Sequence, residues 1–313
     1  MTRKEFIKIC GILGVGIPAQ LSLASFINDK KVTSSFKGKV IIIGAGAGGL
    51  SAGYLLQQKG IDFEILEASA IYGGRMKVNT DFADFPIPLG AEWLETSTAI
   101  FEEIVNDSST PVNVETVADA PDRKFVNSSW YGFFEKYIVP SIASKIKYNT
   151  IVESINYSNE QIIITTQNGQ NIADKVIVSV PLKILQDGDI HFIPSLPQKK
   201  LYAINNTIIW EGFKTFIAFS EKFYTDEYKF KITPKSDGEK IYYDAAYGQK
   251  SNKHILGLFV VGKPALAYSS LSDVELKNYI LNELDTIYDN QATPNYIKHI
   301  SQNWKKEPFI KAG

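Results

Sequence analysis

Three glycines are the residues of this chain whose spacing points most directly to chemistry. Gly44, Gly46 and Gly49 form the pattern G-x-G-x-x-G. The first permits a sharp turn, the second lets the backbone approach a pyrophosphate, and the third lets a helix pack closely on a strand. Glu67 follows at the distance where an acid accepts hydrogen bonds from ribose hydroxyls. The spacing predicts a dinucleotide site, and the alternative is a glycine-rich turn without a ligand.

The segments around these residues supply the elements that such a site requires. Residues 40–43 are a short apolar run that predicts a buried parallel strand. Residues 50–59 predict an amphipathic helix that ends at Gly60, and residues 63–66 predict a second strand that ends at Glu67. The N-terminus of that helix would offer free N–H groups and a partial positive charge to the phosphates.

A second glycine pair makes the pattern more specific. Gly73, Gly74 and Arg75 follow Glu67 and Ala68 with the spacing E-A-x4-G-G-R. Paired glycines let backbone amides face a phosphate or a ring, and the arginine adds a planar fork of donors. This extension resembles the flavin-containing amine oxidase family, which includes monoamine and polyamine oxidases and is similar to protoporphyrinogen oxidases and phytoene desaturases. The alternative is a type II turn with a surface arginine.

Further segments resemble the same family in the same order along the chain. They are residues 89–95 (L-G-A-x-W), 151–155 (V-x-x-I), 175–182, 192–197 (F-x-P-x-L-P), 212–216 with 222–224, and the stretch from Asn303 and Trp304 to Pro308. The resemblance implies FAD as the cofactor. The residues it implies in FAD binding are Gly44, Ala45, Gly46, Gly48, Gly49, Glu67, Ala68, Gly74, Arg75, Gly90, Ala91, Glu92, Trp93 and Val152.

The resemblance also suggests a catalytic residue. Lys214 aligns with the family's lysine that holds a water near flavin N5, and it shares a strand face with Phe216 and Ala218. A partly desolvated amine there suits proton or water handling, whereas the alternative is a lysine whose head reaches bulk water. Glu95 falls where some polyamine oxidases place a carboxylate that could attract a cationic amine; it could equally be a solvated loop residue.

The resemblance implies an FAD-dependent oxidoreductase of the amine oxidase type. Such an enzyme passes a hydride from the C–N bond of an amine substrate to flavin N5, and dioxygen reoxidises the flavin. Two alternatives stay open. One is a flavoenzyme of the same fold that acts on a carotenoid or porphyrin-like substrate, and the other is a degenerate, non-catalytic protein that binds FAD or a nucleotide.

Composition excludes several other classes. The 313 residues carry a formal net charge of −1 with no basic stripe, so no nucleic-acid partner is expected. Cys10 is the only cysteine, which leaves no intramolecular disulfide, thiolate metal site or cysteine nucleophile in the body of the protein. His191, His254 and His299 lie far apart, so no metal site is expected.

Residues 1–25 have the pattern of a secretory signal. A basic start is followed by a short, glycine-rich apolar stretch and then by small residues, and the stretch is too short for a stable membrane span. Residues 2–8 resemble the twin-arginine motif, with Lys4 in place of the second arginine. Export to the periplasm or outside the cell is expected. The alternative is an uncleaved anchor or the tail of a cytoplasmic protein.

The expected fold class is α/β, with a Rossmann-like FAD-binding domain, a β-meander and a mixed α+β substrate domain. Five units are expected: a signal segment (1–25), the first part of the FAD-binding domain (36–100), a reduced helical and loop insert (101–145), the return strands of the FAD-binding domain (146–195) and the substrate domain (196–313). The family's F-A-G-E segment is not in the sequence, so the last domain is expected to be truncated or part of a fragment.

Pattern also predicts individual elements. The meander is expected at residues 151–155, 161–166 and 174–180, with a turn at Asn168 and Gly169. Helices are expected within residues 92–106, from 129 to Pro140, and at 273–288 with Ser272 as N-cap. The aromatic residues of 129–144 are assigned to the core rather than to a substrate cage. Strands of a second sheet are expected at residues 208–219, 231–234, 241–246 and 254–261.

Overall fold

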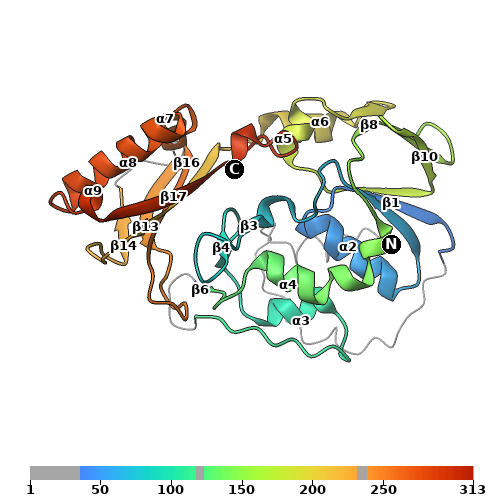
Figure 1. The fold of residues 1–313 in the computed structure, drawn as a ribbon. Coiled ribbons are helices and arrows are strands. Elements are labelled where there is room, and N and C mark those ends of the chain that lie inside the picture. The colour runs from blue at the N-terminus through green and yellow to red at the C-terminus, as the bar shows by residue number, and fades with distance from the viewer. Residues whose placement is uncertain (1–35, 118–122, 231–237, 313) are drawn as a thin grey trace.

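The computed structural model describes residues 36–117, 123–230 and 238–312. The predicted signal segment and the strand expected at 231–234 lie outside these ranges. The chain forms two lobes that lie side by side (Figure 1), and the segment after the last strand runs between them. Among the described residues, no helix combines the length and the apolar character that crossing a bilayer would take.

The first lobe is built on a parallel sheet that confirms the Rossmann-like prediction. Its strand order is β11-β1-β2-β7, with every neighbouring pair parallel. Helix α2 (Ala47–Gln58) connects β1 to β2. Strand β1 is apolar almost throughout because the sheet is covered on both faces. The four strands are β1 (Lys39–Ile43), β2 (Asp62–Leu66), β7 (Ile146–Lys147) and β11 (Lys175–Val178).

The prediction for residues 174–180 is wrong in one respect. They form β11, which pairs in parallel with β1, and not the third strand of the meander. That third strand is β10, which follows the predicted turn and leaves most of its residues exposed. Period and apolarity predict a strand but do not say which sheet it joins. The second sheet has the order β10-β9-β8-β12 and consists of β8 (Val152–Asn156), β9 (Ile162–Thr166), β10 (Gly169–Ala173) and β12 (His191–Ile193).

The insert is less helical than predicted. Helix α3 (Ala99–Val105) fills only the end of the segment expected to be helical, and β5 (Trp93–Leu94) pairs with β6 (Arg123–Lys124). Helix α4 (Trp130–Tyr137) begins where the Ser129 hydroxyl accepts a hydrogen bond from the Gly132 amide at 3.1 Å. It ends before Pro140, which lies in a following 3₁₀ turn.

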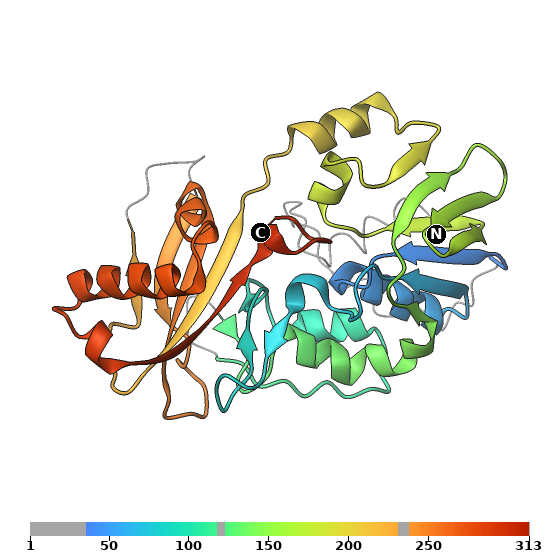
Figure 2. The same cartoon turned by 45° about the horizontal axis from the view of Figure 1, so that its top comes forward.

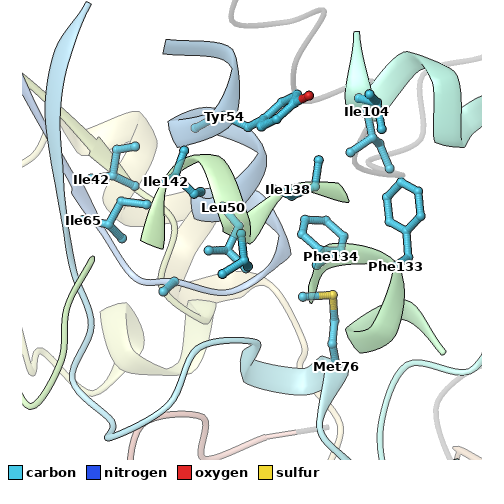
Figure 3. Close-up of a cluster of buried hydrophobic side chains, with 14 of the residues drawn as sticks. Ile42, Leu50, Tyr54, Ile65, Met76, Ile104, Phe133, Phe134, Ile138 and Ile142 are labelled. Atoms are coloured by element: carbon cyan, nitrogen blue, oxygen red, sulfur yellow. The ribbon is translucent and has the colours of Figure 1, made fainter. Parts of the chain in front are cut away.

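Phe133 and Phe134 of α4 belong to the core, as predicted for this aromatic segment, whereas Tyr131 is half-buried and stacks on Tyr72. Phe133 and Phe134 are buried beside Leu50 of α2 and Ile142 (Figure 3). Ile42 of β1 and Ile65 of β2 belong to the same cluster, so this core fixes α4 and α2 against the parallel sheet. Helix α4 is thereby held in place beside the glycine-rich segments.

The second lobe is an antiparallel sheet covered by helices. Figure 2 shows α7 and α8 lying along one face of the sheet, whose order is β14-β15-β16-β13-β17. Its strands are β13 (Gly212–Phe219), β14 (Glu227–Lys229), β15 (Gly238–Asp244), β16 (His254–Gly262) and β17 (Tyr296–Asn303). Its helices are α7 (Lys263–Ser269), α8 (Asp273–Ile287) and α9 (Ala292–Asn295).

Helix α8 confirms its predicted N-cap. The Ser272 hydroxyl accepts from the Glu275 amide at 3.4 Å, and the Glu275 carboxylate accepts from the Ser272 amide at 2.9 Å. This reciprocal pair satisfies N–H groups that the first helical turn leaves free. The remaining elements are β3 (Val78–Asn79), β4 (Ile87–Pro88), α5 (Leu182–Gln186), α6 (Gln198–Asn206), and the 3₁₀ turns η2 (Gly74–Met76), η4 (Ala143–Lys145) and η5 (Trp304–Lys306).

Candidate functional site

The glycine turn between β1 and α2 has a different constraint at each position. Gly44 has φ +98°, the left-handed region that favours glycine. A methyl group on Gly49 would lie 1.8 Å from the Gly44 carbonyl oxygen, so the helix could not approach the strand. A methyl group on Gly46 would meet no protein atom within 4 Å. Protein packing therefore explains Gly44 and Gly49, whereas Gly46 borders open space.

That open space is a cavity of about 1170 Å³ between the two lobes. This volume slightly exceeds the range of roughly 300–1,000 Å³ that is typical of ligand pockets. The cavity brings together many of the residues predicted for the site: Gly44, Gly46, Gly48, Glu67, Ala68, Gly74, Arg75, Gly90, Ala91, Val152 and Lys214. Phe213, Phe259 and Trp304 of the second lobe also line it.

Five predicted residues lie outside the lining of this cavity. Ala45 and Gly49 are buried within the turn, whereas the half-buried Gly46 lines the cavity. The Trp93 ring packs edge-on against Tyr243, with ring centroids 5.0 Å apart. Glu92 is buried behind the wall. Glu95 is exposed to solvent and has no place on the cavity surface.

The Glu67 carboxylate is fixed at the end of β2 by three hydrogen bonds. Oε2 accepts from the Ala45 amide at 2.6 Å, and Oε1 accepts from the amide and the hydroxyl of Ser69 at 2.9 and 2.6 Å. A carboxylate offers roughly four acceptor positions, so capacity is left for a hydroxyl of a bound ligand. The acid is therefore held in place on the cavity wall before any ligand arrives.

The second glycine pair docks directly on the first turn. Gly73 and Gly74 have φ +111° and +53°, and the Gly73 amide donates to the Ala45 carbonyl at 2.8 Å. Arg75 follows on the cavity wall, where solvent in the cavity reaches it while surrounding protein lowers its pKa by desolvation. A methyl group on Gly90 would lie 2.0 Å from the Arg75 carbonyl oxygen, so the predicted L-G-A segment also depends on a close backbone approach.

Lys214 on β13 forms a buried ion pair that the sequence did not reveal. Its Nζ donates to Glu92 Oε2 at 2.7 Å, and the Tyr243 hydroxyl donates to the same oxygen at 2.6 Å. The Lys214 and Glu92 side chains are 5% and 3% exposed. Burial and the negative charge of Glu92 raise the pKa of Tyr243, which keeps its hydroxyl protonated as a donor. The expectation was a single desolvated amine, and the structure gives it a carboxylate partner.

Two further contributors were not predicted. Lys124 on β6 is buried and donates to the Ala245 carbonyl at 2.9 Å. Residues 307–311, after η5, line the cavity and are tied to the first lobe by ion pairs from Glu307 to Lys77 at 2.8 Å and from Lys311 to Asp187 at 3.2 Å. Short strands and turns have no periodic pattern that could have indicated Lys124 or residues 307–311. Of these segments, only the one around Trp304 resembled the family in sequence.

Comparison with known proteins agrees with this geometry. The family model described as flavin containing amine oxidoreductase matches residues 135–313, and the one described as NAD(P)-binding Rossmann-like domain matches residues 42–107. Lysine-specific histone demethylase 1B of Mus musculus is 28% identical over 171 residues, which cover 53% of this chain and 21% of that protein. Probable polyamine oxidase 4 of Arabidopsis thaliana is 26% identical over 164 residues, covering 50% of this chain and 31% of that protein.

The matched segment thus spans about a fifth to a third of the length of these relatives. A solved structure of wild-type putrescine oxidase bound to putrescine has the same fold, with a TM-score of 0.67 at 13% identity over 89% of this chain and 87% of that chain. The first family model covers more than half of the sequence. The chain therefore belongs to the flavin-containing amine oxidoreductase family, whose cofactor is FAD.

Proposed function

We propose that this protein binds FAD in the cavity between its lobes and oxidises the C–N bond of a small amine, with dioxygen as the final acceptor. The observation that carries the proposal is that the glycine turn and Lys214, which is ion-paired to Glu92 behind the wall, line the same cavity. A nucleotide-binding turn alone is common to many classes. A buried lysine from the other lobe, at the wall of the same cavity, adds the group that amine oxidation would use.

The residues present fit FAD. Gly46 and Gly48 give the cavity a backbone surface at the N-terminus of α2, where N–H groups would receive phosphate oxygens. Glu67 would accept from ribose hydroxyls, and Arg75 would supply positive charge near the phosphates. When bound, the flavin supplies the oxidising ring that accepts a hydride equivalent from the substrate.

The second lobe would supply the reaction environment. Phe213, Phe259 and Trp304 form apolar wall that would exclude water and orient the substrate's carbon chain. The Lys214 ammonium, held by Glu92, has further N–H groups with which it would fix a water or exchange a proton at Nζ. Both roles require Lys214 to stay in one place, and the ion pair with Glu92 ensures this.

The relatives support an amine as the substrate class. They carry the names lysine-specific histone demethylase, polyamine oxidase and putrescine oxidase, and each of these names refers to an amine compound.

The test is anaerobic mixing of FAD-loaded protein with a panel of amines that includes putrescine and longer polyamines. We expect loss of the oxidised flavin absorption with at least one amine, and peroxide after air is admitted. Lys214→Met should keep FAD and slow the bleaching. Yellow protein that no amine reduces would instead favour a non-catalytic role, and reduction only by a carotenoid or porphyrin-like compound would favour the other substrate class.

We also propose that residues 1–25 direct export by the twin-arginine route. The basic start and the resemblance at residues 2–8 support this. A reporter that must fold before export, fused behind residues 1–35, should reach the periplasm of a bacterial host. Loss of export after Arg3→Gln is expected, and retention of the unaltered fusion in the cytoplasm would contradict the proposal.

A further inference from the structure

A small chamber lies beside the main cavity, and its lining includes Glu92, Lys124 and Gln249. Its volume is about 10 Å³, which is room for one water molecule. The chamber and the main cavity share Pro86, Ala91, Ser128 and Ser129 as lining residues. Three other chamber residues do not reach the main cavity, namely Glu92, Lys124 and Gln249. Lys214 lines the main cavity but not the chamber. Because Glu92 bonds Lys214 at 2.7 Å, it lies between the two spaces.

Lys124 brings a second buried ammonium to the chamber. Lys124 as a whole residue is 4% exposed. Among the described residues, the Ala245 carbonyl is the one hydrogen-bond partner of its ammonium. An ammonium has three N–H donors, and a water in the chamber would accept another of them. The centroid of the Trp93 ring lies 5.8 Å from Lys124 Nζ. Gln249, which is half-buried, forms the boundary towards solvent.

We propose that Glu92, one water in the chamber and Lys124 form a proton path from Lys214 to the protein surface near Gln249. The inference rests on the proposed amine oxidation. An amine in neutral water is an ammonium ion, and it must lose a proton before its lone pair can support oxidation of the C–N bond. The path gives that proton a route from the cavity to solvent.

The transfers balance in atoms and in charge. A proton from the substrate ammonium reaches Lys214 Nζ through a bound water, while Lys214 passes a proton to Glu92. Lys124 releases one proton to solvent and becomes a neutral amine. That amine then accepts a proton from the chamber water, and the water accepts one from Glu92. One proton enters, one leaves, and no electrons move.

The charges around Lys124 suit this role. Burial lowers the pKa of Lys124, the carboxylates of Glu92 and Asp244 oppose that effect, and the Lys214 ammonium adds to it. Asp244 is itself paired with Lys222 at 2.7 Å. A lysine with a lowered pKa exchanges its proton more readily near neutral pH than an exposed lysine does.

The first test follows Lys124 by NMR in protein labelled with ¹³C and ¹⁵N in its lysines, with and without FAD. Lys124→Met identifies the signal. We expect its titration midpoint to lie below those of the exposed lysines, to fall further in Glu92→Gln and to rise in Lys214→Met, since these variants remove a negative and a positive neighbour. A midpoint that neither variant moves would overturn the proposal whether or not the protein oxidises amines.

The second test measures anaerobic flavin reduction by an active amine across pH. Lys124→Met should slow reduction about 10- to 100-fold at neutral pH, and the rate should recover above the pKa of the amine, where the substrate arrives already neutral. A merely structural role would slow it equally at every pH. Lys124→Arg keeps the charge but cannot give up its proton, so it should be slow as well; full activity of Lys124→Arg would overturn the path.

Lys240 provides the matched control. It is another buried lysine, paired with Glu283 in the second lobe, and it lines neither the cavity nor the chamber. Lys240→Met should leave the pH profile of reduction unchanged. If the wild-type protein oxidises amines while Lys124→Met has the wild-type profile, the proton path fails and the proposed function stands.

Discussion

Gly46 and Gly49 are three positions apart, yet a methyl group at each would meet opposite surroundings. The one on Gly49 would collide with the Gly44 carbonyl oxygen, whereas the one on Gly46 would enter the cavity. Gly49→Ala should therefore lower the free energy of unfolding of FAD-free protein by at least about 1–3 kcal/mol. Gly46→Ala should unfold like wild type and bind FAD more weakly, because its methyl group occupies ligand space.

Urea unfolding without FAD and a fluorescence titration with FAD measure the two effects separately. Each variant is the control for the other, since both add one methyl group to the same turn. Equal FAD affinity in Gly46→Ala and wild type would contradict the placement of the pyrophosphate at Gly46.

The buried pair of Lys214 and Glu92 makes a second prediction at the scale of residues. Glu92→Gln leaves a largely buried ammonium without its counter-charge, and breaking one partner of such a pair costs about 3 kcal/mol. Replacing both, in Glu92→Gln with Lys214→Met, should restore part of that loss because no unpaired charge remains. Glu95→Gln, on an exposed neighbour, should change stability little.

Chemical denaturation of the four proteins at one pH measures these differences. A double variant that is less stable than Glu92→Gln alone would show that the two residues do not act as a pair.

The local parts of this site could be predicted from sequence, and the long-range parts could not. The three glycines and Glu67 lie within one strand–helix–strand unit, whose spacing reflects backbone geometry. Glu92 and Lys214 are separated by 122 positions, and no pattern in either segment indicates the other. Lys124 lies on a strand of two residues, too short for any period.

Elements show the same division. The N-cap of α8 was predicted because Ser272 and Glu275 make both of their bonds within one turn. The pairing of β11 with β1 was not predicted. The two strands are more than a hundred residues apart in the sequence, so their pairing depends on the arrangement of the whole sheet. The turn at Asn168 and Gly169 was recognised, but the polar strand after it was overlooked in favour of the next apolar run.

The segment after β17 gives a pH prediction at this scale. Burial alone would raise the pKa of Glu307, but hydrogen bonds from Lys77 and Gln302 to its ionised form lower the pKa overall from 4.5. Its stabilising contribution is therefore present above pH 4.5 and is lost as the pH falls through the lowered value. Glu307→Gln should cost about 0.5–1 kcal/mol at pH 6, a modest amount because both partners are partly exposed.

Measuring the free energy of unfolding of wild type and Glu307→Gln from pH 6 down to pH 3 checks the direction of this pH dependence. The difference between wild type and Glu307→Gln should shrink towards the acid end. Glu239→Gln, on an exposed residue of β15, controls for the loss of one carboxylate, and a difference that grows on acidification would contradict the assignment.

At the scale of the whole molecule, the cavity belongs to neither lobe alone. Gly46, Glu67 and Arg75 line it from the parallel-sheet lobe, and Lys214 and Phe259 line it from the antiparallel sheet. The sequence indicated a nucleotide unit and a substrate domain with a second sheet, but no pattern in it showed which residues of the two sheets would face the same cavity. The segment after β17 adds a third contribution, through Trp304, whose indole N–H donates to the Leu89 carbonyl at 3.1 Å.

A ligand held by both lobes should stabilise both. A ligand that binds only the folded protein adds about 2.7 kcal/mol to the free energy of unfolding at 100 times its Kd. Hydrogen exchange with FAD at that excess should therefore slow at the amides of β1 and α2 and, together with them, at those of β13 and β16. Gly46→Ala at the same FAD concentration should show a smaller effect in both lobes. Slowing confined to β1 and α2 would mean that FAD contacts the glycine turn alone, and the lysine of β13 would then lie too loosely against the cofactor to act on it.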